Sequence, residues 1–484
     1  MPVSFDNIPS DLRINGSFIE FNSALAGNSA VNFKLLFIGQ RLATGTVTEN
    51  TPVQVNNADE AEAFFGRGSM LAEMIKAAKK ANSFFECHAI ALDDAAGTAA
   101  TKILTVTGPA TAAGSASIYI GGKKISATIA DTDTPTIIGD TIVAAITADT
   151  TLPFTAANLT GTVTLTAKNK GEAANDIDVR VGYYGETLPA GVAIAVADGV
   201  SGATNPDIST AIAAMGDEWY NWIVMPYTDA TSLTALETEL DTRWGPLVQK
   251  GCRAFTAFRG NLADTTTFGN GRNSPHVSCM GTNISPTPPY IWASVNAIVA
   301  AASLSIDPAR PLQTLTLTGV LPASKAVRWT DSERNTHLFD GIATHKVDAS
   351  GAVHIERQIT MYQTNANSIA DDSYLDINTP ETLERIRYDQ RARFALKFPR
   401  HKLADNAARV APGQAVMQPQ VARAELLDLY RGFETKGWCQ DFDGYKASLI
   451  VEINADDPNR LDIQDSPMLV SALRVHAQQI QFRR

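Results

Sequence analysis

The 484-residue sequence has little cysteine, and none of it lies at the spacing of a metal site or a redox motif. The four cysteines are Cys87, Cys252, Cys279 and Cys439, and each is far from the next along the chain. Disulfide frameworks are typical of short secreted chains, which this is not. We therefore expect four free, buried thiols.

A long uninterrupted apolar run is also missing. The most apolar helix candidate covers 291–306, which is short for a membrane span and contains several polar residues. The N-terminus lacks the basic and apolar stretches of a signal peptide. The sequence therefore predicts a protein that is made and kept in a cytoplasm and does not insert into a membrane.

Basic residues are outnumbered. There are 40 Lys and Arg against 51 Asp and Glu, giving a net charge of -11. Such a chain is not a general nucleic-acid binder, because neutralising phosphates needs clustered Lys and Arg. The length predicts roughly three or four domains.

The sequence motifs of phosphate loops, dinucleotide sites and zinc proteases are absent. The seven histidines are scattered, and even His337 and His345 are separated by a predicted break between a helix and a strand. Packed or solvated histidines are therefore favoured over a metal site. The segment 274–277 resembles the one that follows the nucleophile of subtilisin-like proteases, but the nucleophile position is Gly271. A residue without a hydroxyl cannot form an acyl-enzyme, so we expect neither an enzyme nor a cofactor.

Apolar periodicity divides the chain into five segments. Residues 1–30 are polar and form an N-terminal arm with one short apolar strand. Residues 31–97 predict a strand at 33–39, a helix over 58–80 and a strand at 84–92, which together form a βαβ unit. The same βα rhythm returns over 201–330. We expect these two stretches to form one discontinuous α/β domain with a parallel sheet.

The other segments differ in composition. Residues 98–200 are rich in Thr, Ala and Gly and predict short alternating strands, with one helix near 140–148. This pattern is typical of a β-sandwich or barrel, inserted here in a surface loop of its host. Residues 331–468 predict a C-terminal α+β domain that includes a hairpin at 342–360 and a strand over 445–453. Residues 469–484 form a strand-like arm without a local partner.

One basic cluster stands out. Basic and apolar residues between 385 and 402 occupy separate stripes of a predicted helix. The cluster is either a solvated face, with Glu384 and Asp389 as ion-pair partners, or a docking surface for an acidic protein. Its members are Arg385, Arg387, Arg391, Arg393, Lys397, Arg400, His401 and Lys402.

Several segments together resemble the tail sheath proteins of Mu-like phages. The match covers both ends of the chain and the middle α/β region in the correct order. No residue-specific likeness is carried over to the inserted segment. The segments that carry the resemblance are 8–13, 18–21, 341–344, 355–360, 374–380, 396–405 and 474–482.

This resemblance implies a structural subunit of a contractile tail. Such subunits polymerise as helically stacked six-fold rings around an inner tail tube, and they contract to drive the tube through the host envelope for genome delivery. The expected partners are further copies of the chain, the inner tail tube protein, and the baseplate and tail terminator proteins, without direct nucleic-acid contact. The central domain would have the subtilisin-like topology of the family without catalytic residues. The protein would be part of the virion, assembled in the cytoplasm of a bacterial host.

The resemblance also assigns roles to the two arms, since the arms of sheath subunits add strands to sheets in neighbouring subunits. The basic cluster would be the tube-facing patch. The N-terminal anchors would be Phe18, Ile19 and Phe21. The C-terminal anchors would be Leu473, Val475, Ile480 and Phe482.

Two alternatives remain at this point. The inserted segment 98–200 would face outward and could make the chain a surface-binding, adhesin-type virion protein. The chain could also form the sheath of a phage-derived bacteriocin-like particle.

Overall fold

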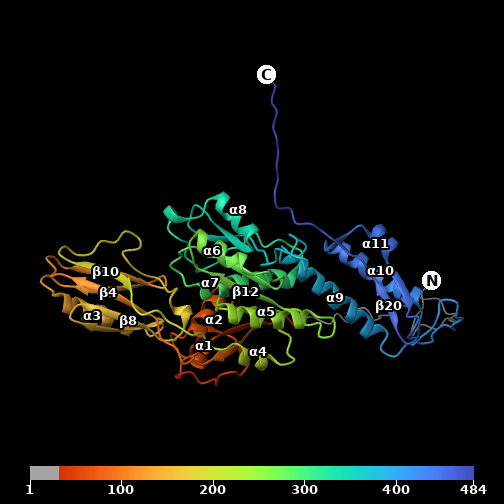
Figure 1. Ribbon diagram of the computed structural model, residues 1–484, viewed down its shortest axis with the longest axis horizontal. Coiled ribbons are helices and arrows are strands. Elements are labelled where there is room, and N and C mark those ends of the chain that lie inside the picture. The colour runs from red at the N-terminus through yellow and green to blue at the C-terminus, as the bar shows by residue number, and fades with distance from the viewer. Residues whose placement is uncertain (1–31, 484) are drawn as a thin grey trace, which may run out of the picture.

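The structure is a computed structural model that describes residues 32–483. Figure 1 shows an elongated molecule with a helix-covered sheet in its middle. Strands from 101–198 lie at one end of the long axis, and the helices that follow residue 378 lie toward the other. The chain is thus a mixed α/β protein with several sheets, as the sequence predicts.

The central sheet has eight strands in the order β15-β14-β13-β12-β11-β1-β3-β2. The strands from β14 to β3 pair in parallel, while β2 and β15 pair antiparallel at the two edges. The predicted βαβ unit is confirmed, because β1 and β3 lie side by side in parallel. The strands are β1 (Leu35–Gln40), β2 (Val53–Val55), β3 (Cys87–Leu92), β11 (Trp222–Val224), β12 (Arg253–Phe258), β13 (Val277–Gly281), β14 (Ile342–Val347) and β15 (Val353–Arg357).

Helices cover the faces of this sheet. They are α1 (Ala58–Phe65), α2 (Met70–Ala81), α4 (Ser209–Met215), α5 (Ala230–Trp244), α6 (Leu262–Asn270), α7 (Pro289–Ile306) and α8 (Asp331–Phe339). Within residues 32–483, α7 alone is long and apolar enough to cross a membrane, but it is mostly buried against α2 and β12. Burial on these two elements makes α7 a core helix of the central body.

The prediction of one helix over 58–80 is wrong, because a turn separates α1 from α2. Gly66 and Gly68 have φ angles of 88° and 77°, a conformation that L side chains rarely adopt. The Ser69 side chain then accepts a hydrogen bond from the backbone N–H of Ala72 and caps the second helix. Because of this turn, α2 packs along α7 without continuing the axis of α1.

Residues 98–203 leave the central body and return to it at one point. The backbone groups of Thr98 and Ala203 form an isolated antiparallel bridge. Between them lie two antiparallel sheets, in the orders β10-β4-β8-β7 and β6-β5-β9, and a helix that packs against both. The elements are β4 (Thr101–Thr107), β5 (Gly114–Ile120), β6 (Lys123–Ile129), α3 (Pro135–Ala148), β7 (Phe154–Leu159), β8 (Thr162–Ala167), β9 (Val179–Val181) and β10 (Ala193–Asp198).

The hairpin of β14 and β15 belongs to the central sheet, although the sequence-based division placed it after residue 330 in the C-terminal segment. Cys279 on β13 pairs in parallel with Ile342 on β14, so the sheet continues across that boundary. A buried apolar strand needs a neighbouring strand for its main-chain groups, and sequence periodicity does not say which strand that is.

The last part of the chain has a core of its own, in which Tyr430 and Tyr445 stack with ring centroids 3.8 Å apart. The predicted strand over 445–453 is half wrong, because α11 occupies its first residues. The Asp441 carboxylate accepts from the backbone N–H of Gly444 and starts that helix. The elements are α9 (Asn378–Lys397), β16 (Lys402–Leu403), β17 (Val416–Met417), α10 (Pro419–Thr435), β18 (Cys439–Gln440), α11 (Phe442–Ser448), β19 (Ile450–Ile453), β20 (Leu461–Gln464) and β21 (Met468–Leu469).

The expectation for the cysteines is confirmed. Cys87, Cys252, Cys279 and Cys439 are free and buried.

Candidate assembly interface

The chain leaves its folded body after β21. The backbone N–H of Val470 still donates to the Trp438 carbonyl at 3.0 Å, but residues 471–483 form no strand in the single chain. Figure 1 shows this C-terminal arm extending away from the other elements. The four anchors predicted from the sequence are 76–82% exposed: Leu473, Val475, Ile480 and Phe482. Four large apolar side chains with so little cover need another surface to bury them.

An ion pair holds the base of this arm. A terminal nitrogen of Arg474 lies 3.0 Å from the Asp376 carboxylate, which also binds Arg357 at 3.1 Å. The Gln313 side chain donates to the Leu473 carbonyl at 3.5 Å. The arm therefore leaves the body from a fixed point, although its anchors lie free.

The anchors fall into two pairs on opposite faces of the arm. Side chains two positions apart share a face of an extended strand. Leu473 and Val475 therefore share one face, while Ile480 and Phe482 share the other. Gln479 precedes the second pair and Gln481 lies between its members, and both glutamines point to the first face.

A two-stranded sheet in the same part of the chain has open edges. β19 pairs with β20 alone among the described residues, and α10 packs against β19. Val451 is cross-strand from Ile463, which is 41% exposed, so the helix covers only part of this face. The edges of the central sheet are less accessible to a long strand. β2 has three residues, and the segment 314–317 covers β15 through hydrogen bonds such as Ile355 N–H to the Leu315 carbonyl at 2.9 Å.

The structure separates the members of the basic cluster. Several of those on α9 are occupied within the chain: Arg387 pairs with Glu384, while Arg393 and Lys397 both bind Glu425. Arg385 pairs with Asp389 at 3.4 Å, and Arg391 binds Gln249. Arg400 and Lys402 lie beyond the helix, exposed and without an ion pair among residues 32–483. The solvated-face interpretation fits the helical members, and the docking interpretation is left with these last two.

The N-terminal anchors Phe18, Ile19 and Phe21 lie outside the described residues.

The segment that resembles a protease is structural. Gly271 ends α6, and Ser274 is buried with its hydroxyl accepting from the backbone N–H of His276. Burial and the nearby Arg253 lower the pKa of His276 to about 2, so its imidazole is neutral. The ring packs against Trp244 at 5.3 Å, as a core side chain does.

The comparisons with known proteins agree with these features. The model of the phage tail sheath protein central domain matches residues 201–361, and that of the phage tail sheath C-terminal domain matches 370–483. The Mu-like prophage FluMu tail sheath protein of Haemophilus influenzae is 42% identical over 486 residues, which cover 100% of both chains. The chain belongs to the phage tail sheath family. It is a tail sheath protein of the Mu-like type, a structural part of a contractile phage tail and not an enzyme.

A solved structure supports the fold. The sheath tail protein of Listeria innocua is 13% identical, with a TM-score of 0.50 over 93% of this chain and 95% of that one. At this identity the likeness concerns the fold alone.

Sequence reasoning missed the Arg474–Asp376 pair and the open hairpin of β19 and β20. Both members of the ion pair lie in segments that carry the family resemblance, 374–380 and 474–482. That resemblance was the available signal, but it did not show that the two segments meet.

Proposed function

We propose that the sheath protein polymerises as helically stacked six-fold rings around an inner tail tube, and that subunits are joined by exchange of their arms. The observation that carries this proposal is the C-terminal arm, which is fixed to the body at Arg474. One exposed apolar anchor directly precedes Arg474, and three follow it. A segment of this kind gains affinity when its main chain pairs with an open sheet edge of another chain. Because the donor and acceptor surfaces differ, the contact does not close on itself, and a helical polymer results.

The acceptor in the next subunit is the hairpin of β19 and β20. A strand added beside β20 would place one face of the arm next to Ile463 and toward α10. The pair Ile480 and Phe482 suits this position, since it lies farthest from the fixed point at Arg474. Burying two such side chains stabilises the contact by about 1.5–3 kcal/mol each.

The test uses the two faces of the arm. We expect a chain with Ile480→Asp and Phe482→Asp to remain monomeric, because two charged side chains would face an apolar surface. A control with Gln479→Asp and Gln481→Asp adds the same charge to the same segment on the opposite face. Electron microscopy and sedimentation velocity would measure rings or tubes. If both variants assemble, or neither does, the face with Ile480 and Phe482 is not the one that contacts the next subunit.

The long axis of the subunit would lie radially. Figure 1 places the inserted strands β4–β10 and the α9 end at opposite ends of the molecule. The segment after α9 carries Arg400 and, at the start of β16, Lys402, two members of the basic cluster without an ion pair among residues 32–483. We assign this end to the tube and the inserted domain of residues 98–200 to the outer surface. Baseplate and terminator proteins would contact the rings at the two ends of the sheath.

Contraction would move rigid subunit bodies while the arms remain threaded as hinges. The extended sheath would be metastable and held by kinetic barriers until the baseplate opens. Its tube contacts must then release easily, and exposed ion pairs are weak enough for this purpose.

Charge reversal tests the tube-facing assignment. We expect Arg400→Glu with Lys402→Glu to reduce co-sedimentation with the purified tail tube several-fold, because the reversed charges would repel an acidic tube surface. The measurement is made at low salt, since salt screens the interaction between exposed charges. Lys80→Glu, at an exposed position on α2, serves as the control. Tube binding by the double variant at the level of the control would exclude this surface.

A further inference from the structure

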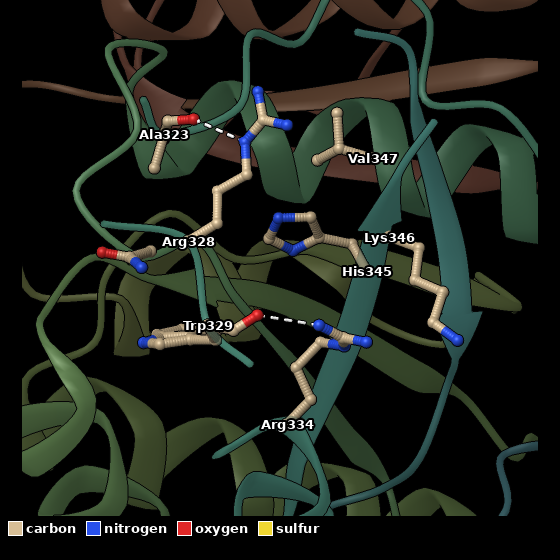
Figure 2. A pocket seen from close by; sticks show the side chains of 8 residues that line it. Ala323, Arg328, Trp329, Arg334, His345, Lys346 and Val347 are labelled. Atoms are coloured by element: carbon tan, nitrogen blue, oxygen red, sulfur yellow. Dashed lines mark hydrogen bonds between the residues drawn. The ribbon is translucent and has the colours of Figure 1, made fainter. Parts of the chain in front are cut away.

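A cationic cavity of about 260 Å³ opens beside α8 in the central body. Figure 2 shows its side chains, with the Arg328 and Arg334 guanidinium groups on either side of the His345 ring. Lys346 adds a third cationic side chain, and no acidic residue lines the cavity. The other lining residues are the apolar Trp329, Ala323 and Val347, and Asn283.

The three cationic groups differ in what they already bind. Arg334 and Lys346 share the Glu356 carboxylate, at 2.7 and 3.0 Å, and Arg334 also pairs with Asp331, so two carboxylates balance these two cations. Arg328 has no ion pair with any described residue, and its Nε donates to the Ala323 carbonyl at 2.9 Å. The two terminal nitrogens of Arg328 therefore have no partner within residues 32–483 and remain able to bind a carboxylate through both donors.

The buried histidine does not add charge to the cavity. Burial lowers the pKa of His345 to about 4, and its Nδ1 donates to the Gly281 carbonyl at 3.1 Å. The imidazole is therefore neutral near pH 7. The unbalanced charge of the cavity is that of Arg328.

We propose that this cavity binds a Glu or Asp side chain of a second copy of the sheath protein. An aliphatic stem would contact the walls at Trp329 and Val347, and the carboxylate would bind Arg328. The second copy is a suitable source, because the chain carries 51 acidic residues and a net charge of -11. The proposal rests on the self-assembly proposed above.

The position of the cavity supports a contact between copies. In Figure 1, α8 lies on a long side of the molecule, away from both the inserted strands and the far end of α9. If those two ends point outward and toward the tube, the long sides are the faces that meet other subunits. Two exposed apolar side chains come from the segments that line the cavity: Val327 precedes Arg328 in the chain, and Phe339, 76% exposed, ends α8. Apolar side chains beside an unpaired guanidinium favour a protein partner over a free phosphate ion.

Zero-length carbodiimide cross-linking of the native chain tests the proposal. Lys346 has an exposed side chain at the cavity, so its amine can be joined to acidic residues of a second copy that flank the side chain bound at Arg328. Assemblies of mixed heavy- and light-isotope chains distinguish links between copies from links to Glu356. We expect mixed-isotope peptides that join Lys346 to an acidic residue. Assemblies without such a link overturn this inference alone, whereas failure to assemble overturns the proposed function as well.

A pair of variants gives an independent measurement. We expect Arg328→Gln to raise the concentration needed for assembly at least about tenfold, because truncating one partner of a desolvated charge pair weakens binding strongly. Lys325→Gln removes an exposed charge three positions away, on the turn Lys325–Val327, and should have little effect. Equal effects of the two variants would exclude a specific carboxylate contact. If 50 mM phosphate lowers the assembly of the unmodified chain and of Arg328→Gln equally, a free-anion site is excluded too.

Discussion

A sheath protein that ends at Val470 is expected to fold but not to assemble. The truncation keeps β21 and its pairing with β18, as well as the hydrogen bond from Val470 to Trp438. It removes the Arg474 ion pair, but Asp376 keeps Arg357 as a partner at 3.1 Å. Since the anchors beyond this point are exposed, their loss removes almost no buried surface from the single chain.

The effect on the polymer should be far larger than the effect on folding. Strand exchange contributes several main-chain hydrogen bonds at about 0.5–1.5 kcal/mol each, besides the apolar anchors. Removing them would raise the dissociation constant between subunits by more than about 1,000-fold. Thermal unfolding should shift by only a few degrees, while electron microscopy should show no rings or tubes. Tubes formed by the truncated chain would show that the arm does not join the subunits.

The central sheet was predictable because its strands are apolar runs that alternate with helices of the right length. β1, α2 and β3 each follow from local pattern, and the parallel pairing of β1 with β3 follows from the helix between them. The domain boundaries were harder to predict from the sequence. β14 joins this sheet by pairing with β13, although α7 and α8 lie between the two strands in the chain. Local pattern does not carry information about such a distant neighbour.

The candidate assembly interface was also predictable only in part. The exposed arm was predictable because its apolar residues have no partner segment nearby in the sequence. The basic cluster was predictable as a helix, but not as a surface. Glu425 lies on α10 and neutralises Arg393 and Lys397 only after α9 and α10 have packed together. Tertiary packing therefore decides which charges remain available to a partner.

The junction between α9 and the central body contains a buried charged pair. The Glu381 carboxyl oxygen lies 3.7 Å from Nε of Arg253, whose side chain is 1% exposed. Two guanidinium groups contact the Trp244 ring, that of Arg253 at 4.6 Å and that of Arg387 at 4.5 Å from the ring centroid. Burial raises the pKa of Glu381 to about 7, although Arg253 acts in the opposite direction.

A raised pKa makes this junction sensitive to pH in a defined direction. In the unfolded chain the Glu381 carboxyl titrates near its ordinary value of 4.5, and in the folded chain near 7. The folded state therefore binds this proton more tightly. Binding this proton stabilises the folded state. The stabilisation is fully present below about pH 4.5 and is lost as the pH rises through 7.

The variant Glu381→Gln should remove this dependence, because the amide resembles the protonated carboxyl in size and does not ionise. We expect the free energy of unfolding of the variant, relative to the unmodified chain, to increase between pH 4.5 and pH 8 by about 3 kcal/mol. Thermal or urea unfolding of monomeric protein at both pH values measures this difference. Glu452→Gln, at an exposed position on β19, should show no such change and serves as the control.

If the difference in the free energy of unfolding between Glu381→Gln and the unmodified chain is the same at both pH values, Arg253 keeps Glu381 ionised at both. An increasing difference would mean that neutral pH loosens the attachment of α9 to the central body. Because we assign the far end of α9 to the tube, that attachment lies between the tube-facing loop and the subunit core. The protonation of one buried carboxyl would then set how rigidly the sheath protein holds its tube contact.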